Sequence, residues 1–434
     1  MKKPPVFPPL AVLVLAVCLA SCAKTGRAAV IWTDRPEFAV YAGYFNAAQN
    51  QYKVEVRCFD DPAARLIRNR KQNGKDIPFL RAANESGPDI VAASWLKNTS
   101  SRVLFRPLES FLGGGRIPEE QFYPPLLSLG KIDGRQYFLP VSFNIPAVVF
   151  ARENAGLPAG NFTTRLEELR TKGKAYNVSP ANGASWSRVG FSPSWSNDFL
   201  FITATLFNTG FREADGLVWD REALENSIRY IRNWIEDANA GMALEDDFYF
   251  KYFFVPPIRL VQSGRILFTS IDSADLFVLG EELRGALDFR WLAGDADEIP
   301  VAENSTWYGI CRDGRAYQAA AAFTRWFFRD DTQRFLLEET KRLRMGENTF
   351  GIAGGFSALR SVTEHIFPHF YPALLGHMPP AESLRAPDIL PRRWMALKTR
   401  VILPWLREQI RAETPPSSRA LEQRIANWIR LNPE

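Results

Sequence analysis

Histidine and cysteine are scarce in this chain, which limits the metal sites that it can build. Three histidines occur in 434 residues, and all of them lie in the segment 365–377. Zinc sites commonly take two histidines, four residues apart, from one face of a helix. His365 and His369 have this spacing, but Pro368 lies between them and disrupts a helix. We therefore expect no metal site and no cofactor.

The residue patterns of common enzyme classes are also missing. The sequence contains no nucleophile-elbow motif and no phosphate-binding loop. Its adjacent acids, Glu119-Glu120 and Asp246-Asp247, are best read as solvated surface pairs. A glycoside hydrolase needs two carboxyl groups roughly 5 to 10 Å apart, and residues distant in sequence can supply them. We expect no catalytic residues, with a secreted carbohydrate-active enzyme as the alternative.

The chain has little net charge for its length. Its 53 Lys and Arg residues against 48 Asp and Glu residues give +5, and no basic patch with interleaved aromatic residues occurs. We therefore expect no nucleic-acid partner. The hydrophobic fraction of 46% and the charged fraction of 23% are those of a soluble globular protein, long enough for two ordinary domains.

The N-terminus has the pattern of an export signal. Lys2 and Lys3 precede an apolar run over 10–20, which is shorter than the roughly 18 residues that a membrane span needs. The run ends in Leu19-Ala20-Ser21-Cys22, which resembles the lipobox of bacterial lipoproteins. We expect 1–21 to be a lipoprotein signal peptide and Cys22 to be acylated. A simple signal peptide with a chance cysteine is the alternative.

Strands and helices alternate in the first half of the mature chain. Short apolar runs predict strands, and the start signals Asp34-Arg35-Pro36 and Asp61-Pro62 predict the helices between them. The expected strands are 30–33, 52–59 and 88–94, with a helix to about residue 50 after the first. This alternation is typical of a parallel sheet with crossover helices.

The second half is richer in helical patterns. We expect helices over 199–208 and 221–240 and a strongly periodic helix from Tyr317. Short strands are expected between the helices, over 265–269, 287–292 and 307–311. The whole chain is therefore predicted to be mixed α/β.

Six motifs occur along the chain in a fixed order. They are Pro88-Asp89-Ile90-Val91, Asp133-Gly134-Arg135-Gln136-Tyr137-Phe138-Leu139-Pro140, Ala155-Gly156-Leu157-Pro158, Ser263-Gly264-Arg265, an alanine-rich helix ending near Asp330-Asp331 and Gln333, and Gly354-Gly355-Phe356-Ser357-Ala358-Leu359. In this order they resemble the extracellular solute-binding proteins of ATP-binding cassette importers, in the branch that takes sugars and oligosaccharides. The similarity covers essentially the whole mature chain. Segments 148–151 and 265–268 depart from the family pattern, so the resemblance leaves the solute open.

The resemblance implies a two-lobed periplasmic-binding-protein fold, with hinge-crossing strands and an interlobe cleft. Segment 130–158 would hold the first crossing, where Pro140 and Pro146 restrict the hinge. The other crossings would lie near 269–274 and 310–314. Lobe one would comprise 28–142 and 270–311, and lobe two would comprise 143–269 and 312–434.

The resemblance also implies a function. The chain would be a substrate-binding lipoprotein that captures a sugar or oligosaccharide between its lobes and delivers it to the permease subunits of an importer. It would be a monomer in the periplasm or at the cell surface, attached to the membrane only through the lipid on Cys22. A ligand-sensing or adhesive surface lipoprotein on the same scaffold is a further alternative.

Sugar sites use aromatic rings, because the C–H faces of sugars pack on flat rings. Four tryptophans in loop-like contexts or near proposed crossings are candidates: Trp95, Trp186, Trp195 and Trp307. Trp95 and Trp307 could instead pack within a lobe. Trp186 and Trp195 could instead cover the end of a helix.

Sugar hydroxyl groups also need polar partners. Asp34, at the end of the first strand, could reach a hydroxyl or cap the following helix. Asp272 could bind ligand, cap the helix beginning at residue 273, or do both. Asn144, in the hinge segment, could line the cleft or satisfy backbone groups.

Two cysteines, Cys58 and Cys311, remain once Cys18 leaves with the signal and Cys22 carries lipid. An exported protein could pair them in a disulfide. The fold implied by the resemblance places them on strands that are not neighbours. We therefore expect two buried free thiols.

Overall fold

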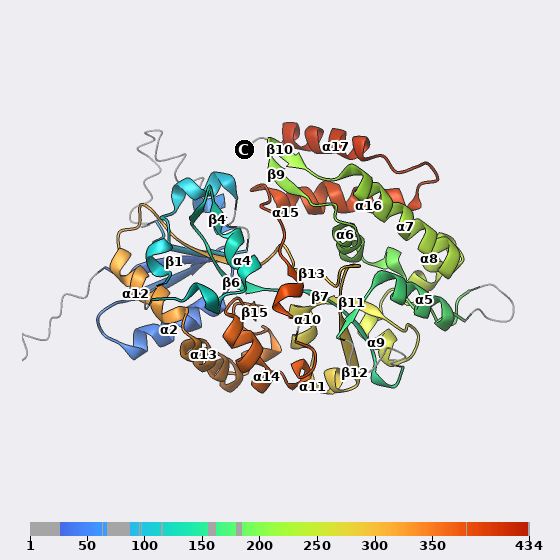
Figure 1. Ribbon diagram of the computed structural model, residues 1–434. Helices are drawn as coiled ribbons and strands as arrows, with labels where there is room; N and C mark the ends of the chain where they lie inside the picture. Colours follow the sequence, from blue (N-terminus) through green and yellow to red (C-terminus); the bar gives the residue numbers. More distant parts are fainter. Residues whose placement is uncertain are drawn as a thin grey trace, which may run out of the picture.

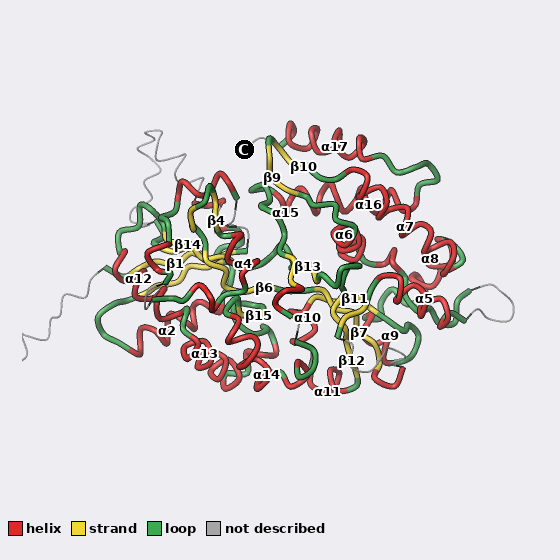
Figure 2. The backbone as a smooth tube through the Cα atoms, viewed as in Figure 1, coloured by secondary structure: helices red, strands yellow, loops and turns green. Residues whose placement is uncertain are grey.

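The computed structural model describes residues 27–62, 64–66, 87–94, 96, 98–113, 116–154, 162–178, 185–378 and 380–432. These residues form two lobes joined in the middle of the molecule (Figure 1). Strands run through the middle from one lobe to the other, and helices lie around them (Figure 2). In the described part of the chain, no helix combines the length and the apolar character that crossing a bilayer requires. The predicted signal 1–21 and Cys22 lie outside the described residues.

A six-stranded sheet forms the centre of the first lobe. In spatial order its strands are β15 (Phe356–Ser357), β6 (Leu139–Phe143), β14 (Thr306–Ile310), β3 (Ile90–Ala93), β1 (Ala29–Thr33) and β2 (Val54–Cys58). β1 pairs in parallel with both β2 and β3, as the alternation of strands and helices predicted. Every residue of β1 is buried, which is usual for a parallel strand covered on both faces.

Helices from both halves of the sequence cover this sheet. They are α2 (Glu37–Ala48), α4 (Pro124–Leu129), α12 (Tyr317–Phe327), α13 (Asp330–Arg342) and α14 (Phe367–Phe370). α12 packs against β1 and β2, and the rings of Phe45 and Phe323 join α2 to α12 at 5.3 Å. The periodic segment after Tyr317 is therefore two helices in lobe one. The sequence placed this segment in lobe two, a difference that follows from long-range packing.

A four-stranded sheet lies in the second lobe. Its order is β11 (Thr269–Asp272), β7 (Pro146–Ala151), β12 (Leu287–Leu292) and β8 (Thr163–Thr164). β7 pairs antiparallel with β11 and β12, and β12 pairs in parallel with β8. Both β11 and β12 thus belong to this sheet, although the sequence assigned 270–311 to lobe one.

Helices surround the second sheet. They are α5 (Leu166–Tyr176), α6 (Asn197–Leu206), α7 (Arg221–Asn239), α8 (Met242–Lys251), α9 (Pro257–Gln262), α10 (Ser273–Val278), α11 (Glu281–Gly285), α15 (Trp394–Leu397), α16 (Leu403–Arg411) and α17 (Ser418–Leu431). α7 buries Leu224, Ile228, Ile231 and Ile235 on one face, the 3.6-residue spacing of an amphipathic helix. Those side chains belong to the core of the second lobe.

Short two-stranded ladders complete the fold. They are β4 (Lys131–Ile132) with β5 (Arg135–Gln136), β9 (Arg212–Ala214) with β10 (Gly216–Val218), and β13 (Ile299–Pro300) with β16 (Leu384–Arg385). The β4–β5 hairpin turns through Asp133 and Gly134, both with positive φ. Asp-Gly is a preferred pair for such a tight turn.

The first crossing lies where the sequence predicted it. β6 ends at Phe143 in the first sheet, and β7 begins at Pro146 in the second. The two later crossings differ from the prediction. The chain returns to the first sheet over 293–305, between β12 and β14. It leaves again after α14, because His377 already packs on Phe289 of β12.

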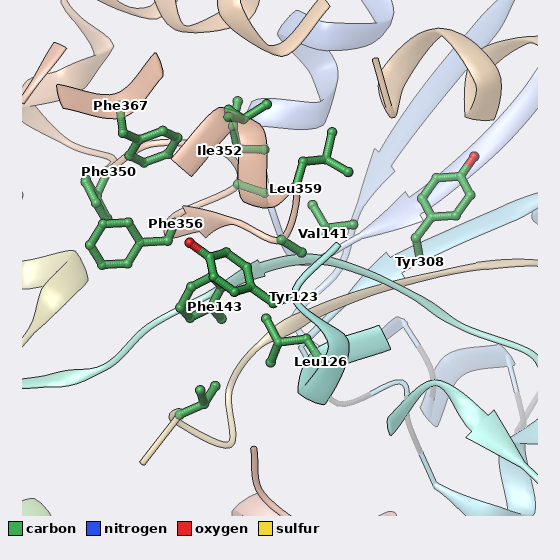
Figure 3. Close-up of a cluster of buried hydrophobic side chains, with 14 of the residues drawn as sticks. Tyr123, Leu126, Val141, Phe143, Tyr308, Phe350, Ile352, Phe356, Leu359 and Phe367 are labelled. Carbon is green, nitrogen blue, oxygen red and sulfur yellow. The ribbon is translucent and has the colours of Figure 1, made fainter. Parts of the chain in front are cut away.

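An aromatic cluster holds the hinge side of the lobes together. Phe143 of β6 contacts Tyr123 at 5.4 Å and Phe356 of β15 at 5.6 Å, and these rings point toward one another in Figure 3. From the second lobe, Phe277 of α10 stacks on Phe350 at 4.6 Å. The buried core is therefore continuous through the hinge.

Cys58 and Cys311 are free. Cys58 ends β2 and Cys311 directly follows β14, and β1 and β3 lie between these two strands. This agrees with the expected separation. Cys311 is buried, as expected, but Cys58 is exposed because β2 is the edge strand of its sheet.

Candidate functional site

Polar side chains gather at the edge of the first sheet where the chain crosses between lobes. Arg35, directly after β1, lies at the centre of this group. Its guanidinium donates from Nε to Thr306 Oγ1 (3.1 Å), and from Nη2 to Ser94 Oγ (3.0 Å) and the Asn304 carbonyl (3.3 Å). The carboxyl ends of β1 and β3 and the start of β14 meet at this edge, because β3 lies between β1 and β14.

Asp34 has one hydrogen-bonded carboxylate oxygen, and the other, Oδ1, lies 3.9 Å from Arg35 Nε in a long ion pair. Oδ2 accepts from the Ser94 backbone N–H at 3.0 Å. Oδ1 is buried, and no described residue hydrogen-bonds to it. Burial raises the pKa of Asp34, and the Ser94 N–H and the charge of Arg35 oppose that rise. Helix α2 has no side-chain cap, so Asp34 does not have the capping role that the sequence allowed.

Two further buried polar atoms have no hydrogen-bond partner among the described residues. They are Asn304 Oδ1, in the second crossing, and Trp195 Nε1, just before α6 in the second lobe. Buried polar atoms are usually hydrogen-bonded, because an unpaired one loses its bonds to water. Asp34 Oδ1, Asn304 Oδ1 and Trp195 Nε1 are thus two acceptors and one donor whose hydrogen-bonding capacity the described residues leave unused.

Asp272 faces this group from the second lobe, at the end of β11. Its Oδ1 accepts from the Ala274 N–H at 2.8 Å and so caps α10, one of the roles the sequence allowed. Burial raises the pKa of Asp272 to about 7, and the charges of Asp275 and Asp198 raise it further, while Arg35 lowers it. The influence of Arg35 places Asp272 within electrostatic reach of the first lobe.

Asn144 joins the lobes at the first crossing. Its Nδ2 donates to the Gly354 carbonyl (2.9 Å) in the first lobe, and its Oδ1 accepts from Ser273 Oγ (2.7 Å) in the second. The side chain is buried and bonded at both ends. The sequence left two roles open for Asn144, lining the cleft or satisfying backbone groups. The hydrogen bonds to Gly354 and Ser273 favour the second role.

Trp186 and Trp195 lie together in the second lobe, beside α7 and α8. Trp186 donates from Nε1 to the Asn239 carbonyl (3.1 Å). Trp195 stacks on Phe248 of α8, with ring centroids 5.6 Å apart and planes 18° apart. Both rings are partly buried, and Trp195 keeps its N–H unpaired within the described residues.

A buried acid holds the loop that carries these tryptophans. Glu245 of α8 has no exposed surface and accepts hydrogen bonds from Ser194 Oγ and Asn239 Nδ2. Ser194 is next to Trp195, and Asn239 also receives the Trp186 N–H. Burial raises the pKa of Glu245 to about 7, and the two hydrogen bonds only partly oppose this rise.

Trp307 belongs to the apolar core of the first lobe. Its side chain is 3% exposed and packs in the cluster that contains Trp32 and Phe105. It also borders a cavity of about 20 Å³ together with Ser94, Glu303 and the segment 387–391. Trp95, the fourth predicted tryptophan, lies outside the described residues.

The segment 386–391 of the second lobe reaches across to the first. Ile389 packs against the first-lobe cluster, while its carbonyl accepts from the Glu213 N–H (2.7 Å) of the β9–β10 hairpin. On the second-lobe side of this segment lies a cavity of about 350 Å³, bordered by Phe201, Trp394 and Glu303 among others. The segment thus forms a wall between the lobes.

Sequence reasoning missed Arg35, Asn304 and the segment 386–391. Arg35 follows the predicted Asp34 directly, but in the sequence Asp34-Arg35-Pro36 indicates only the start of a helix. Asn304 lies in the second crossing and 386–391 in the second lobe, and both positions depend on which strands pair. Within the described residues, no group of three or more His, Cys, Asp or Glu side chains is placed to hold a metal ion.

No protein-family model matches this sequence, and no curated protein matches it. Solved structures match in fold over nearly the whole chain. The cyclic alpha-maltosyl-1,6-maltose binding protein from Arthrobacter globiformis is 16% identical, with a TM-score of 0.59 over 92% of this chain and 96% of that chain. A cyclo/maltodextrin-binding protein complexed with maltotetraose is 15% identical, with a TM-score of 0.60 over 95% and 100%.

The maltose/maltodextrin-binding domain from Bdellovibrio bacteriovorus, bound to maltotriose, is similar to the same extent. It is 15% identical, with a TM-score of 0.55 over 93% of this chain and 100% of that chain. All three are described as binding proteins or domains. The chain therefore has the two-lobed α/β fold of sugar-binding proteins of the maltodextrin-binding type.

Proposed function

We propose that this protein is the substrate-binding lipoprotein of an ATP-binding cassette importer, which captures a sugar or oligosaccharide between its lobes. In this proposal it acts in the periplasm or at the cell surface, carries lipid on Cys22 and delivers solute to permease subunits. It performs no chemistry on the solute. The fold shared with sugar-binding proteins supports the solute class.

The observation that carries the proposal is the set of unpaired polar atoms at the interlobe region. Asp34 Oδ1 and Asn304 Oδ1 can each accept a hydrogen bond from a sugar hydroxyl, and Trp195 Nε1 can donate one. Arg35 lies beside both residues, with Nε 3.9 Å from Asp34 Oδ1 and Nη2 donating to the Asn304 carbonyl, and its side chain is 23% exposed. A sugar, which both donates and accepts through every hydroxyl, satisfies this mixture.

The two aromatic candidates in lobe two have different roles in this proposal. Trp195 is partly exposed with a free N–H, so it is suited to stack on a sugar ring. The N–H of Trp186 is already bonded to Asn239, so Trp186 supports the loop. Trp307 has almost no exposed surface, so we assign it to packing.

Capture follows from contacts that only the closed form makes. Asp34 and Asn304 belong to the first lobe and its crossing, and Trp195 and Asp272 to the second. A ligand that bonds both sets shifts the lobes toward closure by the difference in its affinity for the two states. Asn144 stays bonded to both sides and keeps the hinge in place.

The proposal is tested on the chain that starts at residue 23, which keeps every described residue. It is titrated with maltose, maltotriose, maltotetraose and mannobiose while tryptophan fluorescence is followed, and the sugars are then analysed by mass spectrometry. We expect a saturable fluorescence change and unaltered sugars. Hydrolysed or transferred sugar would refute capture without chemistry, and no response to any sugar would refute the solute class.

Two variants locate the site. Asp34→Ala removes an acceptor, and we expect its sugar affinity to fall at least about tenfold, the size of a lost hydrogen bond to a charged group. Asp295→Ala removes an exposed acid of the second lobe and should leave the affinity unchanged. Equal affinities in both variants would exclude Asp34 from the site.

A further inference from the structure

Four large apolar side chains at the end of α8 and just after it are exposed to solvent. Phe250, Phe253 and Phe254 are 85%, 55% and 92% exposed, and Val255 is 38% exposed. We call this group the aromatic finger. Scattered exposed apolar residues are ordinary on a protein surface, but a contiguous group of this size marks an interaction surface.

The aromatic finger stands on a packed base. Tyr249 contacts Phe253 at 5.4 Å, and Phe253 contacts Phe254 at 5.0 Å, both edge to face. Beneath them Phe248 is fully buried. Two prolines, Pro256 and Pro257, follow the finger and restrict its backbone. The rings are therefore held outward by packing that does not depend on a ligand.

Exposed cations lie within the aromatic finger and after it along the chain. Lys251 lies within it, and Arg259 lies in α9, which begins two residues after Val255. Arg265 follows α9, and Arg188 is brought beside it because the Val189 N–H donates to the Arg265 carbonyl at 2.9 Å. All four cations are exposed, and none forms an ion pair with another described residue.

Acids do not neutralise this surface. Asp246 of α8 is already paired, since both of its carboxylate oxygens accept from Arg411 at 2.7 Å. Asp247 is an exposed acid of the same helix. Along this part of the chain the exposed cations Lys251 and Arg259 outnumber Asp247, the one unpaired acid of α8.

We propose that the aromatic finger inserts into the headgroup region of an anionic lipid membrane. Phenylalanine side chains with neighbouring Lys and Arg are the chemistry of surfaces that lie in the membrane interface, where rings enter the acyl boundary and cations meet lipid phosphates. The unpaired positive charge favours a lipid surface over a second copy of this chain, because two copies would bring the same cations together. The finger adds a membrane contact to the one predicted at Cys22, and it does not rest on the proposed sugar capture.

The position of the finger is compatible with this role. α8 lies at the end of the second lobe, far from β1 in the first (Figure 1). A membrane contact there leaves the first lobe and its crossings free to move. Of the residues assigned to the solute, Trp195 contacts the base of the finger through Phe248 and Tyr249, so sugar titration of the finger variants is part of the test.

The test uses the chain from residue 23 on, so that no lipid is attached. Its binding to vesicles of equal parts phosphatidylcholine and phosphatidylglycerol is measured by flotation, with pure phosphatidylcholine vesicles for comparison. We compare the parent with Phe253→Ser/Phe254→Ser, with Lys251→Gln/Arg259→Gln, and with Leu375→Ser, an equally apolar residue that is 67% exposed elsewhere. Far-UV circular dichroism and sugar titration check that each variant is folded.

We expect the parent to bind the anionic vesicles. The double serine variant should bind at least about tenfold more weakly, the loss for two apolar side chains that no longer leave water. The double glutamine variant should lose about fivefold for each removed charge and bind with less dependence on salt. Leu375→Ser should bind as the parent does.

Four results would overturn the proposal. The first is a parent chain that binds neither kind of vesicle, and the second is a serine variant that binds as tightly as the parent. The third is concentration-dependent association of the parent that the serine changes abolish, which would make the finger an interface between copies. Loss of sugar affinity in the serine variant with unchanged vesicle binding would also overturn it, since the finger would then belong to the solute site.

Discussion

Replacing the buried Glu245 by Gln should change how stability depends on pH. Glu245 has no exposed surface and is held by two neutral side chains, Ser194 and Asn239. Burial raises the pKa of its carboxyl from 4.5 to about 7. In the folded protein the group therefore keeps its proton over a range in which the unfolded chain has lost it.

The magnitude follows from the two pKa values. The difference between 4.5 and about 7 corresponds to about 3 kcal/mol of unfolding free energy, at roughly 1.4 kcal/mol for each pH unit. Because the folded state binds the proton more tightly, stability falls as pH rises from 4.5 to about 7. Above that pH both states are ionised and the loss is complete.

Glu245→Gln keeps the shape of the side chain and cannot ionise. We expect the variant and the parent to differ little at pH 4.5, and the variant to be more stable by about 3 kcal/mol at pH 8. The assay is urea unfolding at pH 4.5, 6 and 8, followed by tryptophan fluorescence. Asp272, whose pKa burial raises to about 7, is present in both proteins, so its contribution cancels in the difference.

Glu338→Gln serves as the control, because Glu338 is exposed in α13. Its difference from the parent should not vary with pH by more than a few tenths of a kcal/mol. If the difference between Glu245→Gln and the parent is the same at pH 4.5 and pH 8, the reasoning from burial is refuted. The Glu245 carboxylate would then be stabilised by groups other than Ser194 and Asn239.

Three further predictions concern the hinge, the site and the thiols. Asn144→Ala should lower the unfolding free energy by about 3 kcal/mol in urea titrations, because its buried partners in both lobes lose their hydrogen bonds. An unchanged urea midpoint would contradict the role of Asn144 in joining the lobes. Arg35→Lys should weaken sugar binding about tenfold in the fluorescence titration, since a lysine cannot reproduce the guanidinium fork; full affinity would remove Arg35 from the site. A thiol reagent added to the chain from residue 23 on should modify Cys58 in the native state and Cys311 only after denaturation. Rapid labelling of Cys311 in the native protein would show that its surroundings open.

Much of the local structure was predictable from the sequence because it depends on neighbouring residues. The strands expected over 30–33, 52–59 and 287–292 agree with β1, β2 and β12 within two residues at each end. Alternating strands and helices indicated parallel pairing in the first sheet, and Asn144 marks the first crossing. The order of six short motifs indicated the two-lobed fold itself.

The partners of later segments could not be predicted in this way. The strand expected over 265–269 is β11 at Thr269–Asp272, and it pairs with β7, more than a hundred residues earlier. α12 packs on the first sheet, although the sequence assigned 312–434 to lobe two. Such pairings depend on which apolar surfaces meet in the assembled chain, and local patterns carry no information about them.

The candidate site, like the fold, was predictable from the sequence only in part. Composition and motifs drew attention to Asp34 and Trp195 as residues of the right chemical type. Only the tertiary structure determined that Asp34 Oδ1, Asn304 Oδ1 and Trp195 Nε1 are buried without hydrogen-bond partners among the described residues, and that Asn144 is bonded at both ends of its side chain. Residue type follows from sequence, whereas burial and hydrogen bonding are set by contacts between segments that are far apart along the chain.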